Sequence, residues 1–181
     1  MGKVFKLSAG SDKLEKAVFD ALKKLESVDG AERLVPEVGV NLVYSKPNPE
    51  STSDVVALDG RVVVSSGKPR ACGDVKYGGS RFLSSVVLEA IRLDPTKRSA
   101  IVIRGGIDIA EALITMGKKI LYLPPESSNY YCPVAKYLEN EHSVYDAYSH
   151  PGAFGIEPTT TILAETPKEL IEIIGELVHY V

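Results

Sequence analysis

The chain has 181 residues, of which 44% are hydrophobic and 25% charged, and this length and composition predict one globular domain with a sizeable core. A net charge of −3 and a pI of about 5.7 provide no basic field for nucleic acid. Two distant cysteines, Cys72 and Cys132, argue against a disulfide scaffold. Without a signal-peptide pattern or an apolar run of membrane-spanning length, the sequence predicts a cytoplasmic protein.

The first predicted helix begins after Asp12. Asp12 and Glu15 have the spacing of a capping box, and apolar residues recur at helical intervals as far as Leu25. We treat residues 1–33 as an N-terminal lead and helix, and residues 34–181 as the core of the same single domain.

The next stretch turns at Pro36-Glu37 and enters an apolar run that holds Asn41. A polar side chain in a buried strand must be hydrogen-bonded or meet a ligand, so Glu37 and Asn41 are candidate site residues. After a Pro- and Ser-rich loop at 45–53, the pair Asp59-Gly60 predicts a type I′ turn between strands at 55–58 and 61–64. A third short strand is expected at about residues 70–75.

Helices alternate with strands in the second half of the chain. Helices are expected after Ser80, at an Asp108/Glu111 capping box, near Pro133 and after Thr166. Strands are expected at 99–104, 120–123 and 159–163, and the first two could form a parallel pair. These elements predict an α/β fold, a three-layer α/β/α sandwich around a mixed sheet.

Three further features are candidate ligand sites. A helix that starts at Gly78-Gly79-Ser80-Arg81 offers free N–H groups to a phosphate, although a plain turn with a serine cap has the same sequence. Arg104 ends a buried strand and needs an anionic partner, either a phosphate or the carboxylate of Glu37 or Glu157. The glycine-rich loop with Gly155 and Glu157 could wrap a small ligand or form only a tight turn. The histidines lack zinc-site spacing.

The order of several short motifs resembles the ThiN domain, a thiamine-phosphate synthase that is often fused behind a hydroxymethylpyrimidine kinase. The motifs are Pro36-Glu37-Val38-Gly39-x-Asn41, Asp54-Val55-x-Ala57, Gly60-Arg61, Tyr77-Gly78-x-Ser80, Asp94-Pro95-x-x-Arg98-Ser99-Ala100, Ile103-Arg104 and Gly155-x-Glu157-Pro158. The resemblance implies a class II aldolase/epimerase-like fold with a mixed, mostly antiparallel sheet. It also implies that hydroxymethylpyrimidine diphosphate and hydroxyethylthiazole phosphate are joined to give thiamine phosphate and pyrophosphate.

That chemistry assigns roles to the candidate residues. Arg104 and Glu37 are assigned as catalytic, and Mg²⁺ is expected to accompany the diphosphate, although no residue is assigned as a metal ligand. The expected partners are small phosphorylated thiamine precursors, without nucleic acid or membrane, and a homodimer is considered. The substrate-binding residues are Asn41, Gly78, Gly79, Ser80, Arg81, Gly155 and Glu157.

The predicted helix start departs from the family pattern. Phe82 and Ser85 stand where enzymes of the family commonly have a histidine and an arginine. The alternative function is therefore a non-catalytic ThiN-like module that binds thiamine phosphate or a precursor. With one helix before Pro36 and no kinase segment, we expect a stand-alone domain. A third hypothesis, an aldolase- or epimerase-type enzyme, lacks a histidine cluster for zinc.

Overall fold

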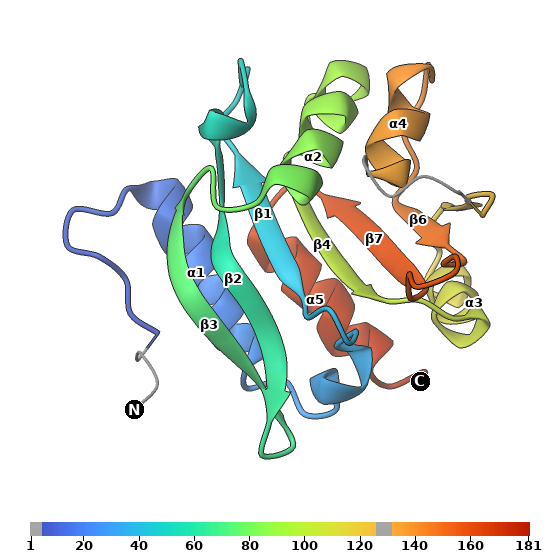
Figure 1. Cartoon of the computed structure of the whole chain (residues 1–181), viewed down its shortest axis with the longest axis horizontal. Helices are drawn as coiled ribbons and strands as arrows, with labels where there is room; N and C mark the ends of the chain where they lie inside the picture. The colour runs from blue at the N-terminus through green and yellow to red at the C-terminus, as the bar shows by residue number, and fades with distance from the viewer. Residues whose placement is uncertain (1–4, 126–131) are drawn as a thin grey trace.

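The computed structural model describes residues 5–125 and 132–181 and contains one seven-stranded sheet (Figure 1). The strands lie in the order β3-β2-β1-β4-β7-β6-β5. The strands are β1 (Asn41–Ser45), β2 (Val55–Ser65), β3 (Lys68–Tyr77), β4 (Ser99–Arg104), β5 (Ile120–Tyr122), β6 (Ala147–His150) and β7 (Thr159–Ala164). The helices are α1 (Lys13–Leu25), η1 (Ala31–Leu34), η2 (Thr52–Asp54), α2 (Arg81–Leu93), α3 (Ile107–Thr115), α4 (Pro133–Glu139) and α5 (Pro167–Leu177).

The sheet is mixed, as the sequence predicts. Neighbouring strands pair antiparallel except β5 and β6, which are parallel. The expected parallel pairing of the strands at 99–104 and 120–123 is wrong, because β7 and β6 lie between β4 and β5. The helix between these two strands therefore connects strands that are not neighbours.

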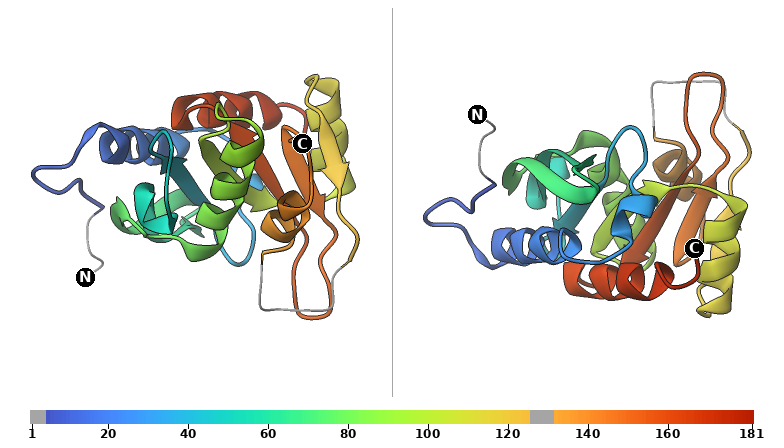
Figure 2. Two further views of the ribbon diagram at one scale, coloured as in Figure 1. Left: turned by 90° about the horizontal axis from the view of Figure 1, so that it is seen from above. Right: turned by 90° about the horizontal axis from the view of Figure 1, so that it is seen from below.

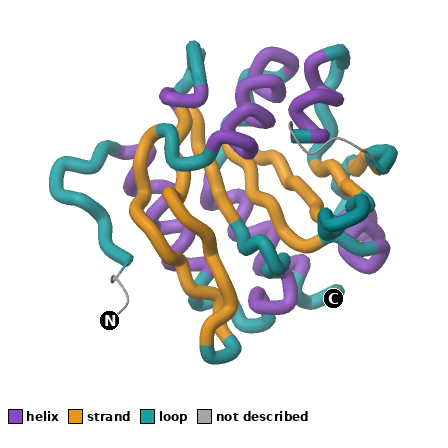
Figure 3. The backbone as a smooth tube through the Cα atoms, viewed as in Figure 1, coloured by secondary structure: helices purple, strands orange, loops and turns teal. Residues whose placement is uncertain are grey.

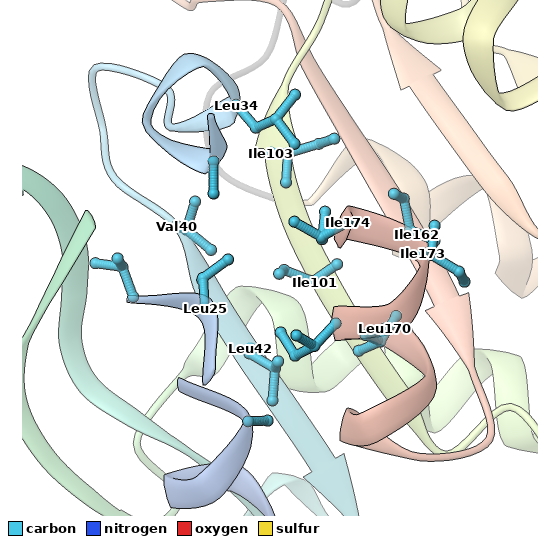
Figure 4. Packing of buried hydrophobic residues seen from close by; sticks show 14 of the residues in the cluster. Leu25, Leu34, Val40, Leu42, Ile101, Ile103, Ile162, Leu170, Ile173 and Ile174 are labelled. Atoms are coloured by element: carbon cyan, nitrogen blue, oxygen red, sulfur yellow. The ribbon is translucent and has the colours of Figure 1, made fainter. Parts of the chain in front are cut away.

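Helices pack on both faces of the sheet, which Figure 2 shows from its two ends. Helices α1, α3 and α5 contribute apolar residues to one buried cluster, and α2 and α4 contribute to a second one. Figure 4 shows the first cluster, in which Leu25 of α1 and Leu170 of α5 lie over Leu42 and Ile101 of the sheet. We call the face under α2 and α4 the front face. In Figures 1 and 3 these two helices lie over its upper half and leave the lower half open.

The β2–β3 hairpin differs from its prediction in the position of the turn. Both residues of the loop, Ser66 and Gly67, have positive φ (52° and 73°), as a two-residue type I′ turn requires. The predicted turn at Asp59-Gly60 is wrong, because β2 continues through it and Gly60 pairs with Gly73. A Cβ on Gly60 would lie 1.9 Å from the Cys72 carbonyl oxygen, so this glycine permits a close strand approach instead of a turn.

Helix ends follow the predicted caps in two of three cases. Asp12 and Glu15 form the reciprocal capping box of α1, and Thr166 accepts a hydrogen bond from the Glu169 N–H at the start of α5. The predicted Asp108/Glu111 box is wrong, because α3 begins two residues earlier than this box requires, with Gly106 as its N-cap. Among the described residues, no helix is long and apolar enough to cross a membrane.

Candidate functional site

The front face contains two cross-strand rows of residues near the open half of the sheet. In the first row Asn41 of β1 is opposite Val102 of β4, which is opposite Thr161 of β7. In the second row Arg104 is opposite Thr159, which is opposite His150 of β6. Directly opposed residues of an antiparallel pair project from the same face. Two residues predicted for the site therefore share these rows with threonines of β7: Asn41 is in the row of Thr161, and Arg104 is in the row of Thr159.

A pocket of about 250 Å³ lies over these rows. Strands β4, β6 and β7 form its floor, the starts of α2 and α4 form walls, and the β6–β7 loop closes one side. Its lining residues are Phe82, Leu83, Val102, Cys132, Pro133, Val134, His150, Ile156, Thr159 and Thr161. The lining is mostly apolar with a few polar groups, which is the usual composition of a small-molecule site.

The N-terminus of α2 lies at the edge of this pocket, because its second residue, Phe82, lines it. Gly79 crosses β2 so closely that a Cβ there would lie 2.7 Å from the Ala57 carbonyl oxygen. Ser80 is the N-cap residue, but its side chain makes no capping hydrogen bond. The first-turn N–H groups of α2 therefore lack a side-chain cap, and Arg81 is exposed beside them.

Arg104 is engaged mainly by the protein itself. Its guanidinium donates to the carbonyls of Arg33 and Gly105 and forms a two-point ion pair with Asp108, with Nη–Oδ distances of 3.1 and 2.7 Å. The hydrogen bonds from Arg104 hold the pKa of the Asp108 carboxyl below its usual value, against the opposing effect of burial. Among the described residues, the carboxylate partner of Arg104 is thus Asp108, not Glu37 or Glu157 as the sequence suggested.

Glu157 connects the β6–β7 loop to the turn before β1. Its carboxylate accepts hydrogen bonds from the backbone N–H groups of Glu37 (2.9 Å) and Val38 (2.7 Å). Next to it, the Gly105 N–H donates to the Pro158 carbonyl, which attaches the same loop to the end of β4. Glu157 thus positions the turn that carries Glu37. Glu37 itself is exposed to solvent.

Asn41 is 2% exposed and its amide bonds to the backbone. Val43 pairs with Ala57, but Val40 bridges to Val62, so β1 residues 41 and 42 face β2 residues 58–61. The Asn41 Nδ2 donates to the carbonyls of Leu58 (3.0 Å) and Gly60 (3.4 Å) across this bulge, and Oδ1 accepts from the Leu42 N–H. The side chain therefore satisfies backbone groups that the irregular pairing would leave unbonded.

None of the predicted site residues is among those that line the pocket, and apart from Asn41 they form two groups next to residues that do. Gly78, Gly79, Ser80 and Arg81 surround the start of α2, whereas Glu37, Arg104, Gly155 and Glu157 lie at the end of the sheet near the β6–β7 loop. Sequence reasoning did not select the polar residues of the pocket floor, Thr159, Thr161 and His150. The available signal was the alternation of threonines along β7, which places Thr159 and Thr161 on one face.

Comparison with known proteins identifies the family. The family model described as Thiamine-phosphate synthase ThiN matches residues 17–176. The chain belongs to the ThiN family. It is 28% identical over 163 residues to the Thiamine-phosphate synthase ThiN of Methanothermobacter thermautotrophicus, an alignment that covers 84% of this chain and 86% of that protein.

Solved structures agree with the ThiN family assignment. The C-terminal domain of a phosphomethylpyrimidine kinase matches with a TM-score of 0.80 and 31% identity, over 91% of this chain and 98% of that one. An aldolase II superfamily protein from Pseudomonas syringae matches with a TM-score of 0.53 and 12% identity, over 94% and 75% of the two chains. The second likeness concerns the fold alone, and it agrees with the aldolase-like architecture that the ThiN resemblance implied.

Proposed function

We propose that this ThiN domain is a thiamine-phosphate synthase that joins hydroxymethylpyrimidine diphosphate to hydroxyethylthiazole phosphate. The observation that carries the proposal is the family match over residues 17–176. In the reaction the bond between the pyrimidine methylene carbon and the diphosphate oxygen breaks, and its electron pair leaves with pyrophosphate. The lone pair of the thiazole nitrogen forms the new carbon–nitrogen bond and gives thiamine phosphate.

The site residues suit the negative charge of the diphosphate that departs in this reaction. The uncapped N–H groups at the start of α2, with Ser80 and Arg81, suit the departing diphosphate because a helix N-terminus favours an anion. Arg104 has five N–H donors, and the structure engages four of them with described residues, so one remains for a ligand. Stabilisation of the negative charge that develops in the transition state is the main contribution that such donors can make.

The expected Mg²⁺ fits this site only if the protein and the substrate diphosphate both contribute ligands to it. Among residues 5–125 and 132–181, no group of three or more His, Cys, Asp or Glu side chains is arranged to hold a metal. Magnesium commonly binds one or two carboxylates together with substrate phosphates and water. Glu37 is the exposed carboxylate at this end of the sheet that would hold it, whereas the Glu157 and Asp108 carboxylates bond to protein groups. When bound, Mg²⁺ would neutralise charge on the diphosphate.

A non-catalytic ThiN module is the second candidate, and the start of α2 favours it. Phe82 cannot donate a hydrogen bond to a phosphate, and the Ser85 hydroxyl already donates to the Phe82 carbonyl at 2.6 Å. Such a module would bind thiamine phosphate or a precursor without turnover.

A turnover assay separates the two candidates. The purified protein is mixed with both substrates and Mg²⁺, and thiamine phosphate is measured as its fluorescent oxidation product, thiochrome. Product that increases with protein concentration supports the synthase. Tight binding of thiamine phosphate by calorimetry, without any product, replaces the synthase with the binding module.

The role of Arg104 is tested with a second arginine, next to the opposite end of β4, as the control. Arg104→Ala is expected to lower turnover by at least about a hundredfold while circular dichroism shows a folded protein. Arg98→Ala removes an arginine at the opposite end of β4, where it donates to the Ser45 carbonyl, and should keep most of the activity. Turnover in Arg104→Ala equal to that of the wild type rejects the assigned role.

A further inference from the structure

We infer that the pocket over β4, β6 and β7 binds the aminopyrimidine ring, with Phe82 stacking on the ring and the Thr161 hydroxyl recognising its edge. This assignment rests on the proposed function, which supplies the two rings between which the pocket must discriminate. None of these pocket residues was selected from the sequence as a ligand-binding residue.

The size of the pocket favours one small ring. Its volume of about 250 Å³ is below the range of roughly 300–1,000 Å³ that is typical for drug-sized ligands. Both substrates, each with a phosphate group, would not fit inside it together. A single heterocycle could enter while its phosphate group stays outside, toward the uncapped N-terminus of α2.

The walls of the pocket favour a flat aromatic ligand. Phe82 is 54% exposed although it is a large apolar side chain at the pocket edge. An aromatic ring that covered it would remove apolar surface from water and gain a stacking contact. Val102 and Ile156 complete an apolar enclosure on the sheet and loop sides.

The floor of the pocket offers hydroxyl groups for hydrogen bonding. Thr161 is 5% exposed and lines the pocket, and no hydrogen bond to its hydroxyl is recorded from any residue in the described part of the chain. The Thr159 hydroxyl, in the neighbouring cross-strand row, likewise has no hydrogen bond from the described residues. A hydroxyl both donates and accepts, so these groups match a ring that carries acceptor nitrogens and a donor amino group.

The reaction chemistry distinguishes the pyrimidine from the thiazole. The thiazole nitrogen must present a free lone pair to the methylene carbon, so a hydroxyl that donated to it would block the reaction. The pyrimidine nitrogens and amino group do not form the new bond and can remain hydrogen-bonded throughout. A hydroxyl-bearing pocket therefore suits the pyrimidine.

The test measures binding of unphosphorylated hydroxymethylpyrimidine by calorimetry, and separately binding of hydroxyethylthiazole phosphate. Thr161→Val keeps the shape of the side chain and removes the hydroxyl. It should weaken pyrimidine binding about five- to tenfold, the effect of one lost hydrogen bond. Phe82→Ala should weaken it at least about tenfold through loss of stacking. Thiazole phosphate binding should change less than twofold in both variants.

Thr160→Val is the matched control. Thr160 is the neighbouring residue on β7, fully buried on the opposite face of the sheet, and its hydroxyl has no hydrogen-bond partner among the described residues. This variant should bind the pyrimidine as the wild type does. An equal loss in Thr160→Val and Thr161→Val would overturn the assignment, because it would report a general disturbance of β7.

Other outcomes separate this inference from the proposed function. Turnover in Thr161→Val and Phe82→Ala at the wild-type rate and KM would overturn the pocket assignment and leave the synthase intact. Pyrimidine binding that depends on Thr161, in a protein without turnover, would reject the synthase and support the pocket. Failure of the wild-type protein to bind hydroxymethylpyrimidine, or a loss confined to thiazole phosphate binding, would overturn the pocket assignment.

Discussion

Substitution of Asn41 by alanine tests whether this buried amide belongs to the backbone or to the ligand. The change removes hydrogen bonds to the Leu58 carbonyl at 3.0 Å, the Gly60 carbonyl at 3.4 Å and the Leu42 N–H at 2.8 Å. Each buried polar group left without a partner costs about 1–3 kcal/mol. The Gly60 bond is longer than a typical hydrogen bond and contributes little.

The hydrogen bonds with the Leu58 carbonyl and the Leu42 N–H therefore account for most of the loss. Asn41→Ala should lower the free energy of unfolding by about 2–4 kcal/mol. Urea unfolding followed by circular dichroism measures this change, provided that the slope with denaturant concentration stays constant. Ser99→Ala is the control, because the Ser99 hydroxyl makes one buried hydrogen bond, to the Val43 carbonyl at 2.7 Å. Its loss should be about 1 kcal/mol.

The reasoning is refuted if Asn41→Ala is as stable as the wild type within about 0.5 kcal/mol, the range of a neutral surface substitution. An unchanged stability together with lost substrate binding would assign the amide to the ligand, which is the role that the sequence predicted. A stability loss with normal binding per folded molecule would assign it to the bulge.

Three further substitutions test what stabilises the fold. Gly60→Ala should destabilise the protein by more than about 3 kcal/mol, because its Cβ would lie 1.9 Å from the Cys72 carbonyl oxygen. Gly67→Ala, whose Cβ would meet open space, should cost only about 1–2 kcal/mol. Equal losses of the two variants in thermal unfolding would contradict this expectation. Burial raises the pKa of Asp146, but hydrogen bonds from Lys97 and the Lys119 N–H lower it more, so its folded pKa lies below the unfolded value. The stability from Asp146 is thus present above pH about 4 and lost as pH falls through the folded pKa, so Asp146→Asn should flatten the acid side of the stability–pH curve, and an unchanged slope would oppose this.

Local signals in the sequence predicted the helix starts and failed where another partner of the residue decides the structure. Asp12 and Thr166 cap their own helices, so their roles are contained within a few residues. Asp108 has the same local pattern, but Arg104 takes its carboxylate, and α3 starts at a different residue. Gly60 favours a turn by itself, whereas in the sheet its position opposite Gly73 decides its role.

The candidate site shows the same division. Sequence motifs indicated Arg104 and Glu157 as special residues, because arginine and glutamate next to glycines at strand ends need partners. Arg104 pairs with Asp108, four residues along the chain, a partner that the sequence analysis did not select. Glu157 bonds to the backbone of the 37–38 turn, about 120 residues earlier, and no local pattern contains that information. Thr161 became a candidate only when strand register placed it under Phe82 and α2, because a threonine in a strand is otherwise an ordinary residue.

The position of β7 has a consequence for the synthesis of this protein. It is the last strand in the sequence, yet it lies in the interior of the sheet between β4 and β6, and Glu157 just before it bonds to residues 119 and 120 positions earlier. Contacts of such long sequence separation form slowly, since most of the chain must be ordered first. A nascent or truncated chain that ends before Thr159 would have a split sheet and a pocket floor without its two threonines. The pocket is therefore complete only after β7 has been synthesised and has paired with β4 and β6.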